Sequence, residues 1–107
     1  MASETNEHLA LIGYYRLHPT DAEAFRALAA ASVAPTRAKD GCLHYAFAED
    51  VKEPGLFHVA EGWRDREALD AHLASPDFAE TLRQAGELNI SERQVTTFTA
   101  SNGQSLW

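Results

Sequence analysis

The residues best suited to chemistry in this chain are a histidine, a tryptophan and a glutamate in its second half. His72 lies between Leu69 and Leu73 at helical spacing, on the helix side that should face the interior. A histidine there is partly shielded from water and can donate or accept a proton near neutral pH. Trp63 can stack on a planar ligand, and Glu61 places a carboxylate on the same face of a strand. Together the three residue types suggest acid–base chemistry on a flat organic molecule.

Each of these residues also has a purely structural explanation. His72 can be a core histidine whose ring bonds a backbone carbonyl, and Trp63 can anchor the core or a dimer interface. A buried Glu61 needs a partner, which Arg16 or Arg93 on neighbouring strands could supply. The residue types alone leave both explanations open.

Further candidates for ligand contacts are ring and hydroxyl side chains. His44 and His58 lie among alanines and a glycine, whose small side chains leave room for a pocket or for a closely packed helix. Hydroxyl donors for a phenol or quinone oxygen are Tyr14, Tyr15 and Tyr45. Arg83 would contribute only if it turned toward the pocket.

Motifs for metals and cofactors are missing from the sequence. It contains no phosphate-binding glycine loop, no CxxC, no HExxH and no GxSxG. No two of the five histidines share a helix at ligand spacing. If Asp50 pairs with Leu56 in a hairpin, His44 and His58 lie over ~13 Å apart, too far for one metal ion. We therefore expect no metal site within one chain and no cofactor.

Four strands and two helices are predicted to position these candidates. In chain order they are strand 9–18, helix 20–33, strands 42–50 and 56–64 joined as a hairpin, a helix over 65–86 broken at Ser75–Pro76, and strand 90–100. Thr20 and Glu23 fit a capping box for the first helix, and Pro35 should kink or end it near Val33. Asp65 and Ser75 are predicted N-caps, and Gly86 a helix stop.

This order predicts the α+β class, with the ferredoxin-like split βαβ pattern (βαββαβ, second helix broken). An antiparallel sheet of this kind carries its helices on one face. The other face must meet water or a second chain, and small or apolar residues on both hairpin faces favour a homodimer. We expect a flexible N-terminus over 1–8, one domain over 9–100 and a tail over 101–107.

Length and charge narrow the class of protein. The chain has 107 residues and a formal net charge of -7, so an acidic surface disfavours nucleic-acid binding. Its single cysteine, Cys42, excludes an internal disulfide and fits a reducing compartment. The first eight residues do not resemble a signal peptide, and no apolar run is long enough to cross a membrane. We therefore expect a cytoplasmic protein without nucleic-acid or membrane partners.

The stretches APTRAKDGCLHYAFAED and HVAEGWRDREALDAHLASPDF resemble the antibiotic biosynthesis monooxygenase family. The matching features are Thr36–Arg37, the Asp40–Leu43 turn leading into Tyr45, Glu61 and Trp63 at a strand end, and Ala68–Leu69 through His72 to Ser75–Pro76 and Phe78. The resemblance covers residues 9–98. It implies a ferredoxin-like monomer and a homodimer in which two sheets form an α+β barrel, and this would cover the second sheet face.

Activities within this family differ. Its namesakes oxidise polycyclic phenols to quinones with O2 and without metal or flavin, while others are quinol monooxygenases, haem-degrading enzymes or isomerases of small phosphorylated ketones. The polyketide-tailoring members are matched at Trp63 and Arg83. Their Asn and Tyr are replaced here by Val59 and Leu69, which argues against oxygenation of a polycyclic phenol.

The residue at position 72 helps to distinguish the haem-degrading and the quinol-oxidising branches of the family. Haem-degrading members carry Asn, Trp and His where this chain has Tyr15, His72 and Leu82, so haem degradation is not expected. The helix histidine of the quinol-oxidising branch is matched by His72. The resemblance therefore favours that branch.

The expected function is cofactor-independent oxidation of a small aromatic phenol or quinol by O2 in a pocket beside the 65–75 helix. The expected catalytic residues are His72, which removes or steadies the phenolic proton, and Trp63. The expected substrate-binding residues are Tyr14, His44, Tyr45, His58, Glu61 and Arg83. Two alternatives stay open: an isomerase or tautomerase of a small carbonyl compound, and a non-catalytic dimer that binds a small molecule.

Overall fold

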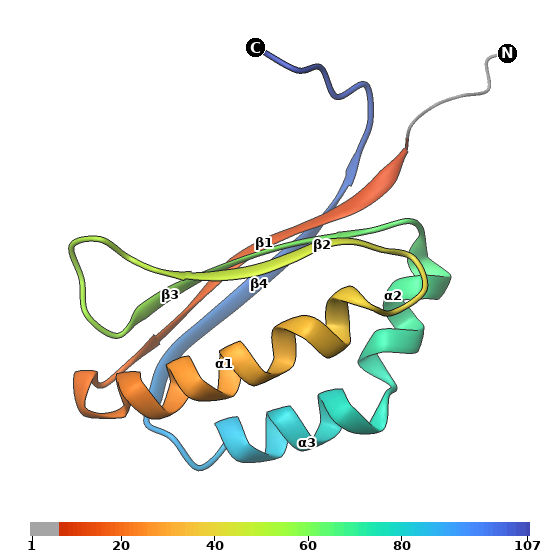
Figure 1. The fold of residues 1–107 in the computed structure, drawn as a ribbon. Coiled ribbons are helices and arrows are strands. Elements are labelled where there is room, and N and C mark those ends of the chain that lie inside the picture. The colour runs from red at the N-terminus through yellow and green to blue at the C-terminus, as the bar shows by residue number, and fades with distance from the viewer. Residues whose placement is uncertain (1–6) are drawn as a thin grey trace, which may run out of the picture.

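A four-stranded antiparallel sheet with three helices on one face forms the protein (Figure 1). The computed structural model describes residues 7–107. Its elements are β1 (His8–Leu17), a 3₁₀ turn (Pro19–Asp21), α1 (Ala22–Arg37), β2 (Cys42–Glu49), β3 (Leu56–Trp63), α2 (Arg66–Leu73), α3 (Pro76–Ala85) and β4 (Ile90–Ala100). The strand order β2-β3-β1-β4 confirms the predicted ferredoxin-like α+β fold. Of the expected flexible segment 1–8, residues 1–6 lie outside the described residues and His8 begins β1.

The β2–β3 hairpin has the predicted register. The Asp50 amide donates to the Leu56 carbonyl at 2.8 Å, and Ala48 pairs with His58. Because side chains alternate between faces, this register sends Tyr45 and Glu61 to the helix-covered face.

The caps of the second helical region also match the prediction. The Asp65 carboxylate accepts from the Ala68 amide at 2.9 Å, and the Ser75 hydroxyl accepts from the Phe78 amide at 3.4 Å. Gly86 follows α3 at its C-terminal cap. Side-chain oxygens thus satisfy amides that have no partner inside α2 and α3.

The predicted cap of α1 at Thr20 is wrong, and of the two alternatives at Pro35, a kink or an end, the end near Val33 is excluded. The helix starts at Ala22, because Thr20 lies in the preceding turn and its hydroxyl lies 2.8 Å from Nδ1 of His18. The helix also runs through Pro35 to Arg37. Proline removes only one backbone donor there. The last turn is held by the buried side chain of Thr36 and by Arg37, whose Nε donates to the Tyr45 carbonyl at 2.9 Å.

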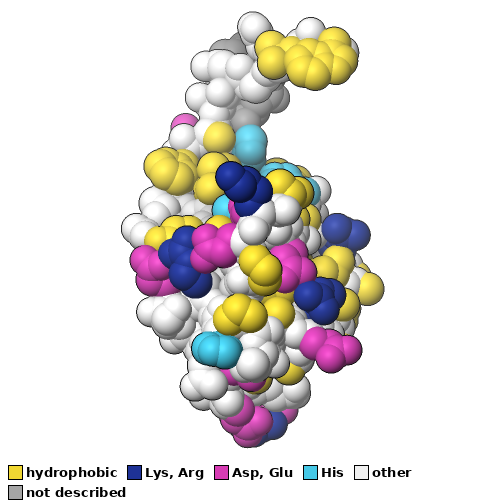
Figure 2. Space-filling model, turned by 90° about the vertical axis from the view of Figure 1, so that its left-hand side faces the viewer, with side chains coloured by type: hydrophobic (Ala, Val, Ile, Leu, Met, Phe, Trp, Pro, Cys, Tyr) yellow, Lys and Arg dark blue, Asp and Glu magenta, His cyan; other side chains and the backbone are white. Residues whose placement is uncertain are grey.

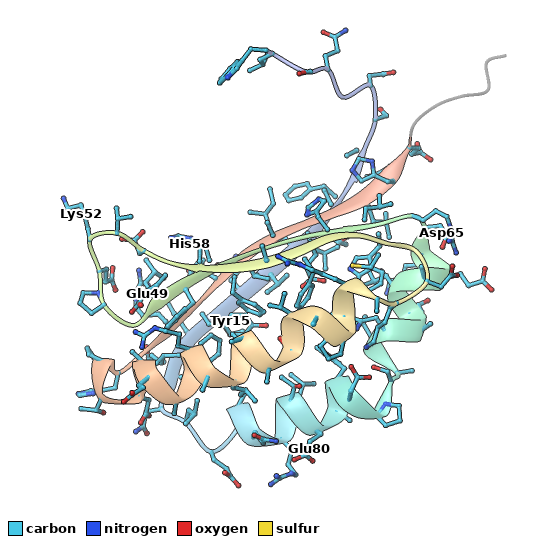
Figure 3. The ribbon with its side chains drawn as sticks, in the orientation of Figure 1. Tyr15, Glu49, Lys52, His58, Asp65 and Glu80 are labelled. Carbon is cyan, nitrogen blue, oxygen red and sulfur yellow. The ribbon has the colours of Figure 1, made fainter. Side chains whose placement is uncertain are left out.

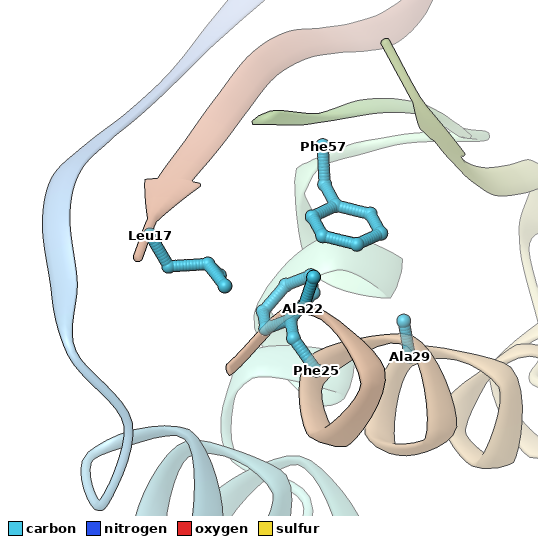
Figure 4. Packing of buried hydrophobic residues seen from close by; sticks show 5 residues of the cluster. All are labelled: Leu17, Ala22, Phe25, Ala29 and Phe57. Carbon is cyan, nitrogen blue, oxygen red and sulfur yellow. The ribbon is translucent and has the colours of Figure 1, made fainter. Parts of the chain in front are cut away.

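The core lies between the sheet and the helices in two clusters. One consists of Leu17, Ala22, Phe25, Ala29 and Phe57 (Figure 4). The other consists of Leu11, Trp63, Ala68 and Leu69. Within the described residues, no helix is long and apolar enough to cross a membrane.

The second sheet face carries no helix. Ile12 and Phe98 on this face are 61% and 52% exposed. The segment after β4 extends away from the globule (Figures 1 and 2), and Leu106 and Trp107 at its end are exposed. These apolar side chains are available for contact with another chain.

We expect Phe25→Ala to lower the free energy of unfolding by about 3–5 kcal/mol, because it empties the centre of the first cluster. The Phe25 ring lies 4.7 Å from that of Phe57 and 5.5 Å from that of Tyr15, centroid to centroid. Urea denaturation followed by circular dichroism measures the change. Val51→Ala is the control, since Val51 is 99% exposed and its loss should change stability by less than about 0.5 kcal/mol. Equal stability of the two variants would contradict this account of the core.

Candidate functional site

Trp63 and His72 form a stacked pair between the sheet and α2. Trp63 ends β3 and is fully buried, and its Nε1 donates to Oε1 of Glu61 at 2.9 Å. The His72 ring lies 4.9 Å from the Trp63 ring, centroid to centroid, at an interplanar angle of 22°. The Asp65 cap fixes the start of α2. On this helix Leu69 and His72 are buried. Leu73, which the sequence predicts on the same face, is exposed.

His72 is held from several sides. It is 3% exposed and packs against the rings of Tyr45 and Phe78, with centroids 5.9 and 4.7 Å away. Lys39 Nζ lies 2.8 Å from His72 Nδ1. An ammonium group can only donate, so Nδ1 accepts and the proton of the neutral ring is on Nε2.

Lys39 joins three parts of the chain. Besides His72 at the end of α2, its ammonium donates to Ser75 Oγ at 2.8 Å and pairs with Asp77 Oδ2 at 2.9 Å. The Ser75 hydroxyl in turn donates to the His72 carbonyl at 2.6 Å. This network ties the loop after α1 to the junction of α2 and α3.

Burial shifts the pKa values of His72 and Glu61 in opposite directions. The pKa of His72 falls from 6.5 to about 4, first because burial disfavours the charged ring and then because Lys39 repels it, while Asp77 opposes the fall. Burial raises the pKa of Glu61 above its ordinary 4.5, and the hydrogen bond from Trp63 limits the rise. Burial therefore weakens His72 as a base and strengthens Glu61.

A small aromatic cavity lies between the sheet and the helices α1 and α3. Its volume is about 30 Å³, room for about one water molecule. Its lining includes Phe25, Phe78, Arg93 and two tyrosines, of which Tyr15 projects from β1 toward the helices (Figure 3). Burial raises the pKa of Tyr15, and raises that of Tyr45 to about 12, so both hydroxyls stay neutral at pH 7.

His72 does not line this cavity but lies behind two of the side chains that do. Tyr45 and Phe78 line the cavity and also contact the imidazole. On its other side His72 borders an outer groove of about 440 Å³, shared with Lys39 and Ser75. The narrow cavity therefore lies against α1 and α3, and the outer groove lies beside α2, the helix next to which the sequence predicts a pocket.

Four of the eight candidate residues do not join this cluster. Tyr14, His44 and His58 lie on the helix-free sheet face, where His58 Nε2 bonds Asp50 at 2.9 Å. Figure 3 shows His58 on the opposite side of the sheet from Tyr15. Arg83 is exposed on α3 and pairs with Glu80 at 2.7 Å. Trp63, Glu61, Tyr45 and His72 do lie together.

Sequence reasoning missed two positions. Lys39 gave no signal, because its contact with His72 joins residues far apart in the chain. The sequence marks Arg93 only as a possible partner for Glu61, whereas the residue pairs across strands with Tyr15 and lines the cavity. Within residues 7–107, no group of three or more His, Cys, Asp or Glu is placed to hold a metal ion.

Lys39→Gln should raise the pKa of His72 from about 4, because it removes a repelling charge and leaves Asp77 facing the ring. Proton NMR titration of the histidine ring measures the midpoint. Lys52→Gln removes the same charge from the exposed β2–β3 loop and should leave the midpoint in place. An unchanged midpoint in Lys39→Gln would refute the electrostatic role given to Lys39.

Comparison with known proteins places the chain in a family. The antibiotic biosynthesis monooxygenase family matches residues 9–84. A Mycobacterium tuberculosis protein named "Putative monooxygenase Rv0793" is 39% identical over 88 residues, which cover 82% of this chain and 86% of that protein. The uncharacterized protein sll1783 of Synechocystis is 30% identical over 101 residues, covering 94% and 69% of the two chains.

Solved structures agree with this assignment. A Deinococcus radiodurans structure described as a "putative antibiotic biosynthesis monooxygenase" superimposes with a TM-score of 0.87 at 27% identity and covers 92% of this chain and 98% of its own. The structure of Rv0793 has a TM-score of 0.83 at 35% identity and covers 92% and 99%. The chain therefore belongs to the antibiotic biosynthesis monooxygenase family.

Proposed function

We propose that the protein is a cytoplasmic, cofactor-independent monooxygenase that oxidises a small aromatic phenol or quinol with O2. The observation that carries the proposal is the aromatic cavity with two neutral tyrosine hydroxyls, next to the half-buried carboxylate of Glu61. Aromatic walls suit a flat ring, and hydroxyls suit its oxygen atoms. The family assignment and the relative named as a monooxygenase support the same class of reaction.

The proposed reaction converts a phenol and O2 into a quinone and water. One oxygen atom enters the ring carbon opposite the hydroxyl, and the other leaves in the water molecule with the two hydrogens lost by the phenol. Removing the phenolic proton makes an electron-rich phenolate, which passes one electron to O2, and the resulting radical pair combines. The protein contributes deprotonation, desolvation and positioning.

Glu61 is the group best placed to accept the phenolic proton. It pairs across strands with Tyr45, and its charge raises the pKa of both Tyr45 and Tyr15. The Trp63 indole N–H orients its carboxylate. The role of His72 stays a prediction: Nδ1 is engaged by Lys39, so the ring is better suited to donate from Nε2 than to act as the base.

The cavity must widen before a ring can enter. It holds about 30 Å³, whereas small-molecule sites span ~300–1,000 Å³. The second candidate, a non-catalytic dimer that binds a small molecule, needs the same widening of the cavity. The isomerase alternative differs from both, because it needs turnover without O2.

The homodimer is part of the proposal. Exposed apolar side chains on the helix-free sheet face, with Ile12 and Phe98 among them, support a second copy as the cover of that face. The exposed arm ending in Leu106 and Trp107 gives each copy a further apolar contact to offer.

Oxygen uptake by metal-free protein against a panel of quinols and phenols tests the function. We expect substrate-dependent uptake that falls by about 10²-fold or more in Glu61→Gln, because the amide cannot accept a proton. Glu67→Gln, on the exposed side of α2, is the matched control and should keep full activity. His72→Ala, checked for folding by circular dichroism, should also lower the rate.

The outcomes separate the candidates. Uptake by Glu61→Gln at the wild-type rate would remove the carboxylate from the mechanism. Turnover that continues without oxygen would identify an isomerase. Ligand binding without any turnover would favour the non-catalytic dimer.

We expect Phe98→Asp to convert the dimer to a monomer, because a buried unpaired charge opposes association. Sedimentation velocity measures the mass in solution. Val51→Asp adds the same charge on the exposed hairpin loop and should leave the dimer intact. A wild-type protein that sediments as a monomer would refute the proposed homodimer.

A further inference from the structure

We propose that Arg93 is an anion-recognition site at the edge of the cavity, and that the ligand is an aromatic ring carrying an acidic group such as a carboxylate. This inference rests on the proposed function only in that the cavity binds a small aromatic molecule. It adds a ligand class and an orientation within the cavity.

The sheet register places Arg93 at the cavity. On β4 it pairs directly with Tyr15 of β1, so both side chains lie on the helix-covered face. Both residues line the cavity, together with Phe78 and Leu82 of α3. Arg93 itself is exposed, and β4 is an edge strand, so the guanidinium stands where the cavity meets solvent.

Arg93 has no carboxylate partner. Within residues 7–107 the Arg93 side chain forms no hydrogen bond or ion pair, whereas Arg26, Arg64 and Arg83 each pair with an acidic side chain. The chain has 16 acidic and 9 basic residues, so acidic partners are plentiful. A guanidinium that stays unpaired beside an apolar cavity remains available to bind a carboxylate through two parallel hydrogen bonds.

Charges of opposite sign act on the Tyr15 hydroxyl. Arg93 favours the ionised hydroxyl and Glu61 disfavours it. The adjacent Glu92 lies on the other sheet face, where it pairs with Arg16. An acidic ligand group is therefore attracted to Arg93 and repelled by Glu61. This fixes the orientation: the acidic group lies at the edge beside Arg93, and the opposite end of the ring points inward toward Glu61.

The test compares two ligands of nearly equal shape, 4-hydroxybenzoate and 4-hydroxybenzamide. Titration of ¹⁵N-labelled protein by NMR gives each Kd and locates the shifts among the cavity residues. We expect wild-type protein to bind the benzoate about tenfold more tightly, a preference that weakens with added salt. Arg93→Gln should abolish the preference by weakening benzoate binding more than benzamide binding, because only the benzoate loses a charge-assisted pair, and Arg93→Lys should restore part of the preference. Arg83→Gln, which removes an exposed, paired arginine, should keep the wild-type preference.

Each failure has its own meaning. Equal binding of both ligands by wild type, or a preference that survives in Arg93→Gln, would overturn the anion site and leave the cavity intact. Binding of neither ligand would refute both the anion site and the proposal that the cavity binds an aromatic molecule. An Arg93-dependent preference in a protein without oxygen uptake would retain the anion site and refute the monooxygenase.

Discussion

The stack of Trp63 on His72 joins the sheet to α2, and much of the structure follows from the need to bury two polar rings together. Burying an N–H group or a ring nitrogen without a hydrogen bond is costly. Glu61 satisfies the indole N–H and Lys39 satisfies His72 Nδ1. Within the described residues, no buried side-chain nitrogen or oxygen lacks a partner. The stack thereby requires β3, α2 and the loop after α1 to lie where they do.

The same burial sets the chemistry of the site. Removal from water lowers the pKa of the His72 ring and raises the pKa of the Glu61 carboxyl, so burial weakens the histidine as a base and strengthens the carboxylate. Two tyrosines remain neutral beside them. The result is an aromatic layer with a carboxylate beside it and, at its edge, one guanidinium that has no acidic partner.

The sheet divides the molecule into two functional sides. Its covered face holds the stack and the cavity, whereas its open face holds His44, His58 and Tyr14 among exposed apolar residues. A strand sends alternate side chains to opposite faces, so a pair such as Tyr14 and Tyr15 is divided between the two sides. Ligand chemistry and chain association are thus assigned to different faces in the proposed function.

The sequence by itself determined the element order, the hairpin register and the caps at Asp65 and Ser75, because alternation and capping are local patterns. It also picked out Glu61, Trp63 and His72, since polar or large aromatic residues at predicted interior positions stand out in the pattern. Only the tertiary structure decided which hairpin face meets the helices, because both faces carry small or apolar residues and the pattern cannot distinguish them. It alone carried α1 through Pro35 and brought Lys39 and Arg93 to the site, because those contacts join segments that only the packed sheet and helices place side by side.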